Sequence, residues 1–301
     1  MEGVVETDPS YLIGAAVAVL VVVPLVVRWV ASWERPVDAP LFPSPDAPRP
    51  PKVERASDKN YTFGQAVEVS GEVLPSGPDA PRVVRWGLVE FFVGVLAFVF
   101  LLIALGRFVG ASDESGGTPV WVSIGLGGLA MLLTPFVVLL VTRTPDRPSP
   151  LAEMMPRTGW GLAAKRGLIL FLIGWPTLIF AVAPLWSAVL QASGVVPGEQ
   201  VVVQQLRESG DARIWLAAIF AAGLVAPIVE EIFFRGFLFV GLRRTVGIHG
   251  AAWGSGILFG LVHFTPSSIL PLALMGVLLG YAFERSRHLA VAIIFHFGFN
   301  A

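Results

Sequence analysis

The sequence predicts an all-α membrane protein, a polytopic bundle of about eight transmembrane helices. Its 301 residues are 54% hydrophobic and only 14% charged. The apolar residues form runs of roughly twenty, which is the length that a helix needs to cross a bilayer. These runs are apolar around the whole helix and not along one stripe, as expected for helices that contact lipid or other helices on all sides. Together these observations place the chain among polytopic membrane proteins.

The first segment is an acidic stretch followed by an apolar run at about residues 11–33. A secretory signal peptide would instead begin with basic residues, and its apolar region would be shorter. We therefore predict that residues 1–33 form an N-terminal membrane anchor and not a cleaved leader.

Residues 34–86 are polar and rich in proline. Such a stretch favours extended, polyproline-like backbone and cannot bury enough apolar surface to fold alone. We predict a proline-rich cytoplasmic linker here. Two alternatives stay open: a short strand pair at residues 61–73, and a role of the prolines in binding a protein partner.

The remaining helical segments fall into two groups. Residues 87–158 hold additional transmembrane helices, expected at about 87–110 and 120–142. Residues 159–301 hold a core with segments expected at about 168–192, 212–243, 250–265, 268–284 and from Leu289 to the end. The last segment is only about 20 Å long as a helix, against a hydrocarbon core of about 30 Å. Residues 195–208 form either a short amphipathic helix at the outer interface or an ordinary loop.

The cations indicate how the chain is oriented, because Lys and Arg gather in the loops at 34–86, 143–167, 243–249 and 284–288. By the positive-inside rule these loops are cytoplasmic and the N-terminus is outside. We expect an integral protein of a bacterial or archaeal cell membrane.

Net charge and cysteine content exclude several classes of function. The formal net charge is −1, so no overall positive field would attract nucleic acid. The expected partners are membrane lipid and a membrane-tethered protein or peptide. The chain has no cysteine, which excludes disulfides, thiolate catalysis and Cys-ligated zinc.

Small residues four apart recur in the last third of the sequence. This spacing lets helices approach closely, so it predicts tight packing of the segments at 250–265 and 268–284. The pairs are Gly250 with Gly254, Gly256 with Gly260, and Gly276 with Gly280.

Two adjacent carboxylates, Glu230 and Glu231, lie inside an apolar run. An ionisable side chain in the bilayer costs several kcal/mol, so such a pair is a functional-site hypothesis by default. Residues four apart on a helix lie about 40° apart, which places Glu231 beside Arg235 and turns Glu230 toward a different neighbour. Pro227 lacks a backbone N–H and is expected to open a polar gap in this helix.

The neighbouring segments carry polar residues at matching depth. His263 and Glu230 each lie about 14 residues, or roughly 21 Å, from the cytoplasmic ends of antiparallel helices, so they can meet. His296 and Asn300 are four apart and share one helical face. The other two histidines, His249 and His288, are expected to be solvated or to face lipid headgroups.

A buried carboxylate, two imidazoles and an amide at one depth suit hydrolysis. The carboxylate takes a proton from water, an imidazole orients that water, and donors hold the developing oxyanion. Glu230 is the predicted base. Taken singly, each of these residues could instead be an interhelical hydrogen-bonding or packing device.

Three motifs in order resemble those of a known family. Glu230-Glu231-Ile-Phe-Phe-Arg235, Phe259-Gly-Leu-Val-His263 and His296-Phe-Gly-Phe-Asn300 resemble the EExxxR, FxxxH and HxxxN motifs of the CAAX protease and bacteriocin-processing (CPBP) family. The resemblance implies that Glu230 activates water, that His263 helps to bind it, and that His296 with Asn300 stabilises the oxyanion. Glu231, Arg235 and Phe259 would support the site.

Members of that family cleave prenylated CAAX proteins near the C-terminus, process peptides or serve in bacteriocin immunity. The resemblance therefore implies a CAAX-type intramembrane endopeptidase that requires no cofactor. A zinc ion held by Glu230, His263 and His296 is an alternative. The alternative functions are a non-proteolytic scaffold or bacteriocin-immunity protein, and a proton-coupled transporter.

Overall fold

The computed structural model describes residues 9–33, 86–110, 118–142, 154–156, 159–198 and 201–300. Its regular elements in these ranges are all helices, so the predicted all-α class is confirmed. The predicted linker at 34–86 lies outside the described residues apart from Trp86, and so does the alternative strand pair at 61–73.

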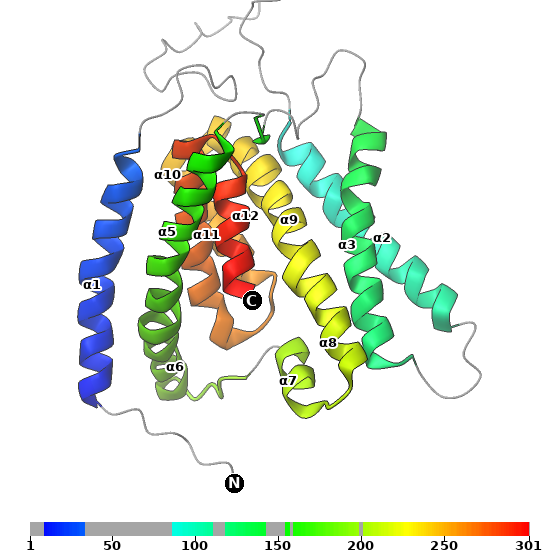
Figure 1. The fold of residues 1–301 in the computed structure, drawn as a ribbon, viewed down its shortest axis with the longest axis horizontal. Helices are drawn as coiled ribbons and strands as arrows, with labels where there is room; N and C mark the ends of the chain where they lie inside the picture. Colours follow the sequence, from blue (N-terminus) through cyan, green and yellow to red (C-terminus); the bar gives the residue numbers. More distant parts are fainter. Residues whose placement is uncertain are drawn as a thin grey trace, which may run out of the picture. The chain divides into compact units, whose positions relative to one another are not determined.

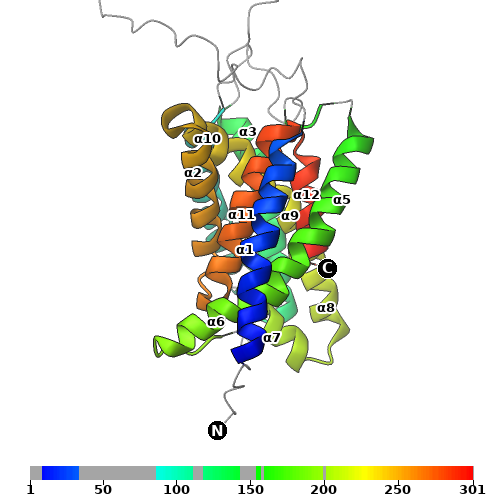
Figure 2. The same cartoon turned by 90° about the vertical axis from the view of Figure 1, so that its left-hand side faces the viewer.

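Three helices precede the predicted core. They are α1 (Pro9–Ala31), α2 (Leu88–Gly110) and α3 (Val120–Thr142). Figure 1 shows α1 on one side of α5 and α11, and α2 with α3 on the side of α8 and α9. In Figure 2, turned by 90°, α1 lies in front of α11.

The next rod contains α5 (Trp160–Thr177), the π-helix η1 (Leu178–Val182) and α6 (Ala183–Ala192). It is followed by α7 (Val201–Glu208). Residues 201–208 of the predicted interfacial segment are therefore helical.

A long helical run carries the two glutamates. It consists of α8 (Ala212–Ala218), the π-helix η2 (Ile219–Val225), α9 (Ala226–Glu231), the π-helix η3 (Ile232–Phe239) and α10 (Val240–Leu261). The run is broken at Gly247, whose φ of 74° and ψ of −176° lie outside helical geometry. Only glycine adopts such a conformation at low cost. The chain then continues through α11 (Pro266–Ser286) and α12 (Ala290–Asn300).

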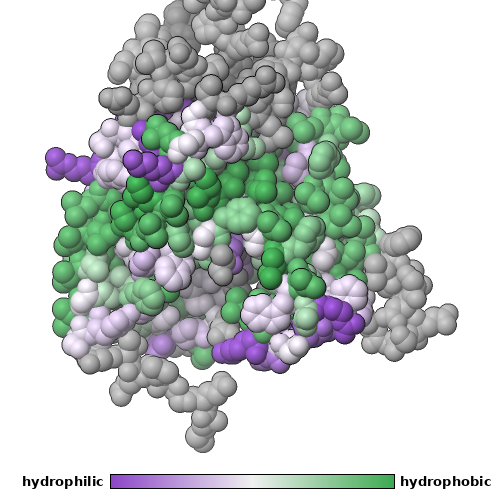
Figure 3. Space-filling model, viewed as in Figure 1, coloured by the Kyte–Doolittle hydropathy of each residue, from purple (hydrophilic) through white to green (hydrophobic). Residues whose placement is uncertain are grey.

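Among the described residues, six helices are long and apolar enough to span a membrane. One of them, Ala212–Leu261, contains the break at Gly247, and the shorter apolar helix Ala290–Asn300 adds a further segment. Each predicted segment therefore has a helical counterpart. Large apolar side chains such as Leu20, Leu96 and Leu140 are exposed by 73%, 71% and 85%. Figure 3 shows apolar residues over most of the middle of one face, with hydrophilic residues toward its upper and lower margins. The chain is an integral membrane protein.

The tightest helix packing joins α10 to α11. A Cβ atom added at Gly276 would lie 2.6 Å from Cα of Gly256, and one added at Gly260 would lie 2.3 Å from the carbonyl oxygen of Ile269. These positions accept no larger side chain, as the small-residue spacing predicts. A Cβ atom at Gly250 would meet only Val246 of the adjoining turn, so this glycine has a local role.

Candidate active site

The buried centre of the site is the carboxylate of Glu231. Its Oε1 accepts a hydrogen bond from Nη1 of Arg235 at 2.8 Å and lies 3.0 Å from Nδ1 of His296. Since a carboxylate only accepts, the His296 ring donates through Nδ1–H. Glu231 therefore pairs with Arg235, as the spacing predicts, and also fixes the orientation of an imidazole from α12, which the spacing does not reveal.

Arg235 is buried by its own set of contacts. Its Nη2 donates to the carbonyl oxygen of Gly276 at 3.1 Å, and its guanidinium carbon lies 4.8 Å from the centre of the Phe259 ring. A guanidinium at this distance from an aromatic face is stabilised by a cation–π interaction. Arg235 thus connects η3 to both α10 and α11.

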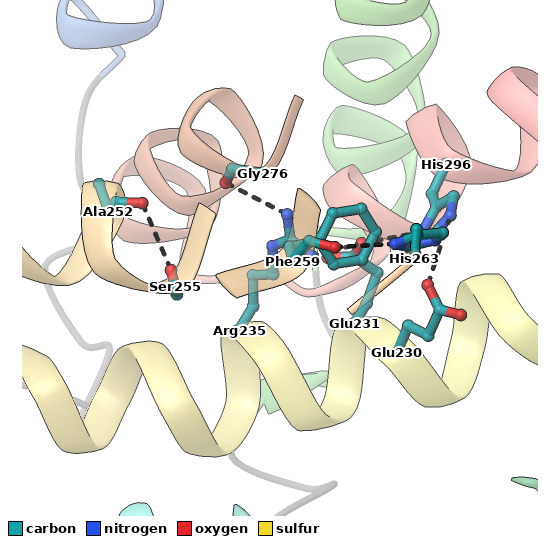
Figure 4. Close-up of polar contacts among 9 residues, drawn as sticks. All are labelled: Glu230, Glu231, Arg235, Ala252, Ser255, Phe259, His263, Gly276 and His296. Carbon is teal, nitrogen blue, oxygen red and sulfur yellow. Dashed lines mark hydrogen bonds and ion pairs between the residues drawn. The ribbon is translucent and has the colours of Figure 1, made fainter. Parts of the chain in front are cut away.

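Glu230 points away from Arg235 and toward the other side of His296. Its Oε2 lies 3.8 Å from Nε2 of His296, a contact that Figure 4 marks with a dashed line. This oxygen is buried and has no hydrogen-bond partner, although the side chain as a whole is 18% exposed. A buried carboxylate oxygen without a partner requires an explanation, and a bound water or substrate group is one.

His263 lies in the same cluster but does not pair with a glutamate. Its Nδ1 is 2.8 Å from the carbonyl oxygen of Phe259, so Nδ1 donates and Nε2 is left for another partner. The Phe259 ring lies 5.0 Å from the His263 ring and 5.6 Å from the His296 ring. Figure 4 shows these three rings on the same side of the helix that carries Glu230. The structure therefore brings His296, and not His263, to within ion-pair distance of Glu230.

Asn300 is anchored by a helix irregularity. In η2 the N–H of Ala226 bonds to the carbonyl of Ala221, five residues earlier. By the same spacing, the carbonyl of Ala222 would accept a hydrogen bond from the N–H of residue 227. That residue is a proline and has no N–H to donate. Asn300 takes that place, because its Nδ2 donates to the Ala222 oxygen at 2.8 Å. The amide keeps a second N–H for another acceptor.

Sequence reasoning missed three backbone and side-chain contacts in this site: the Ala222 carbonyl, the Gly276 carbonyl and the bond between Glu231 and His296. Pro227 is the sequence signal for the first, because a proline removes a partner from a carbonyl one turn earlier. The other two depend on how separate helices meet.

One expectation about the remaining histidines is wrong. His288 is only 3% exposed, and its ring packs edge-on against Trp160 at 4.7 Å. Its Nδ1 accepts the N–H of Ala290, the first residue of α12, at 3.3 Å. Burial lowers the pKa of His288, and a backbone contact with Pro156 opposes that change. His249 is exposed, with Nδ1 2.6 Å from the Tyr281 hydroxyl.

Glu230, His263 and His296 are the residues of the alternative zinc site. Within the described ranges, no group of three His, Asp or Glu side chains is placed to hold a metal ion. His263 and His296 each direct Nδ1 to a hydrogen-bond partner in the protein, which leaves Nε2 of each ring as the nitrogen available to a ligand.

Comparisons with known proteins match the part of the chain that contains these residues. Residues 212–301 match the family described as type II CAAX prenyl endopeptidase Rce1-like. The predicted resemblance to the CPBP family is confirmed. The part of the chain that matches contains all the residues of the three CPBP motifs, whereas α1, α2, α3 and α5 lie outside it.

A relative of Bacillus subtilis (strain 168), named "Putative membrane peptidase YdiL", is 30% identical over 82 residues. The alignment covers 27% of this chain and 34% of that relative, so the chain spans about a third of the length of the curated protein it matches. No solved structure matches the chain.

Proposed function

We propose that this protein is an intramembrane endopeptidase of the CAAX-type processing class, which hydrolyses a peptide bond in a membrane-associated protein or peptide by means of a glutamate-activated water. The observation that supports this most strongly is the buried Oε2 of Glu230, which has no hydrogen-bond partner and lies 3.8 Å from Nε2 of His296. A carboxylate held next to an imidazole and open to one further partner suits a general base. The match of residues 212–301 to a prenyl endopeptidase family supports the same class.

The proposed reaction begins with a water bound to Glu230. The water donates one hydrogen to the carboxylate and the other to Nε2 of His263, whose Nδ1–H is already occupied by Phe259. Glu230 removes the first proton as the water oxygen attacks the carbonyl carbon of the substrate, which yields a tetrahedral oxyanion. The protonated Glu230 then gives its proton to the leaving nitrogen as the C–N bond breaks.

The oxyanion is stabilised by donors from α12. The second N–H of Asn300 is one of them, because its first N–H is held by Ala222. His296 is the other: in its imidazolium form Nδ1 donates to Glu231 and Nε2 donates to the oxyanion. Donors that are held in place before the reaction stabilise the developing charge without the free-energy cost of reorienting.

Glu231 and Arg235 have supporting roles in this proposal. Their pair keeps the Glu231 oxygen in place below His296, and Arg235 fixes the Phe259 ring that both imidazoles contact. No step needs a metal ion or other cofactor. Metal analysis of the purified protein tests this point, because stoichiometric zinc together with chelator-sensitive cleavage would favour the zinc alternative.

The proposed substrate is tethered to the membrane and reaches the site laterally or from the cytoplasmic side. We also propose that the N-terminus is outside and that residues 34–86 are cytoplasmic, on the basis of the cation-rich loops. The proposed location is a bacterial or archaeal cell membrane. Membrane lipid is the expected surrounding partner, and nucleic acid is not an expected partner.

The test uses the full chain in lipid nanodiscs with a farnesylated peptide that ends in a CAAX sequence, and with an unprenylated peptide of the same sequence. Mass spectrometry of the products would reveal cleavage and its position. The proposal predicts cleavage by the wild type and an intact peptide bound to the Glu230→Gln variant. Binding without cleavage by both proteins would indicate a scaffold, and proton flux in liposomes without cleavage would indicate a transporter.

A further inference from the structure

Helix α3 packs closely against η2, in the helical run that carries Glu230. Helix α3 itself lies outside residues 212–301, the part of the chain that matches the prenyl endopeptidase family. A Cβ atom added at Gly128 of α3 would lie 2.8 Å from Cβ and 3.0 Å from Cα of Ala221, and 3.1 Å from Cε1 of Phe220. Ala221 and Phe220 belong to the π-helix η2. Glycine is therefore the residue that lets α3 pack against η2 at this distance.

The next residue of η2 holds a proposed donor of the site. The carbonyl oxygen of Ala222 accepts Nδ2 of Asn300 at 2.8 Å. A shift of η2 away from α3 would move the Ala222 carbonyl relative to α12, since Ala221 and Ala222 are consecutive in the backbone. The Gly128 contact and the Asn300 anchor are thus connected through a single peptide unit.

Helix α12 is backed from another side by α5. A Cβ atom added at Gly298 would lie 2.7 Å from Cδ2 of Phe171, and one at Gly167 would lie 2.9 Å from the carbonyl oxygen of Val291. These close contacts leave α12 little room to follow a moving η2. The distance between η2 and Asn300 is therefore set by α3 from one side and by α5 from another.

We propose that Gly128 is a positioning residue of the active site: its lack of a side chain lets α3 hold η2 where the Ala222 carbonyl orients the Asn300 amide. The role assigned to Asn300 in catalysis rests on the proposed function, whereas the positioning itself does not. The first test therefore measures the Asn300 side chain directly, and activity is a second readout.

The sequence makes the direct measurement simple, because Asn60 and Asn300 are its two asparagines. Selective labelling with ¹⁵N-asparagine gives two side-chain NH₂ signals, and an Asn60→Gln variant assigns them. We expect an Asn300 proton that is shifted downfield by its bond to Ala222, although the side chain is exposed. In the Gly128→Ala variant this signal should move toward the shift of a free amide.

The matched control is Gly127→Ala. Gly127 is on the same helix, one residue away, and an added Cβ there would meet nothing within 4 Å. This variant should leave the Asn300 signal unchanged and keep its fold, since alanine is a better helix former than glycine.

A second variant keeps the test decisive if Gly128→Ala alone folds poorly. Combining Gly128→Ala with Ala221→Gly moves one methyl group from η2 to α3 and removes the closest atom that the new Cβ would meet. The double variant should recover the native Asn300 signal at least in part, with Ala221→Gly alone as its control.

The kcat and KM for cleavage of the peptide substrate provide the second readout. Gly128→Ala should lower kcat by about tenfold or more and leave KM within about twofold, because a displaced donor weakens the transition state more than substrate binding. An Asn300 signal identical in Gly128→Ala and wild type, with both proteins folded, would overturn the proposal. A shifted signal in a protein without peptidase activity would instead uphold the positioning and contradict the proposed function.

Discussion

The pair of adjacent glutamates carries two different tasks because their side chains leave the helix in different directions. Glu231 is fully buried and shares one oxygen between Arg235 and His296. Oε2 of Glu230 lies 3.8 Å from the opposite nitrogen of the same imidazole and has no hydrogen-bond partner. One histidine ring therefore lies between a structural carboxylate and a proposed catalytic one.

Replacing Glu231 by glutamine tests the structural task. The change removes the carboxylate charge that is hydrogen-bonded to Arg235, which is 1% exposed, and leaves that guanidinium buried without its ion-pair partner. Breaking a buried ion pair in this way costs about 3–5 kcal/mol. We expect a loss of about that size in the free energy of unfolding, measured by denaturant titration in detergent micelles.

The control is Glu208→Gln, because Glu208 is an exposed residue that bonds Gln204 within α7. It should change stability by no more than about 0.5 kcal/mol. A Glu231→Gln protein as stable as this control would contradict the structural role of the pair.

At the scale of elements, the site depends on irregular helices. Pro227 follows η2 and cannot supply the N–H that the π pattern would direct to Ala222, so the carbonyl is left for Asn300 from α12. The irregularity creates an interhelical hydrogen bond at the point where a donor is needed. In hydrocarbon, a carbonyl freed by proline must find such a partner.

Restoring the missing N–H should weaken that contact. In Pro227→Ala the new N–H competes with Asn300 for the Ala222 carbonyl, and we expect cleavage to slow by about tenfold while the helix itself is not destabilised. The measurement pairs the rate with the ¹⁵N signal of the Asn300 amide, which should move toward that of a free amide. Pro24→Ala in α1, at an exposed proline inside another helix, should change neither quantity.

The whole molecule contains a buried histidine away from the proposed site. Burial lowers the pKa of His288, so the unfolded chain binds a proton there more readily than the folded one. The contribution of neutral His288 to the free energy of unfolding is complete at a pH above its ordinary pKa of about 6.5. It is lost as the pH falls through the lowered pKa of the folded state. The unfolding temperature should therefore drop more between pH 7.5 and pH 5 in the wild type than in His288→Gln. Equal drops in the two proteins would show that His288 does not titrate on unfolding.

Most of the helix layout could be predicted because the bilayer makes length and apolarity decisive. The run from Leu88 and the run from Val120 were both long enough to read as spans. The polar residues of the site also stood out, since Glu230 and His296 would be costly in lipid without a purpose. The sequence could not tell that His296 lies nearer than His263 to Glu230. That order depends on how the helices that carry Glu230, His263 and His296 are rotated about their axes, which the spacing along the chain does not show.

The central claim is that Glu230 activates the attacking water, and the most direct measurement is the single-turnover cleavage rate of Glu230→Gln against wild type at saturating peptide. Loss of a general base predicts a decrease of about 10²-fold to 10⁴-fold, with peptide affinity and unfolding temperature close to wild type. Glutamine keeps the size of the side chain but cannot take a proton. A rate within about threefold of wild type would contradict the account, because it would mean that another group removes the proton from water.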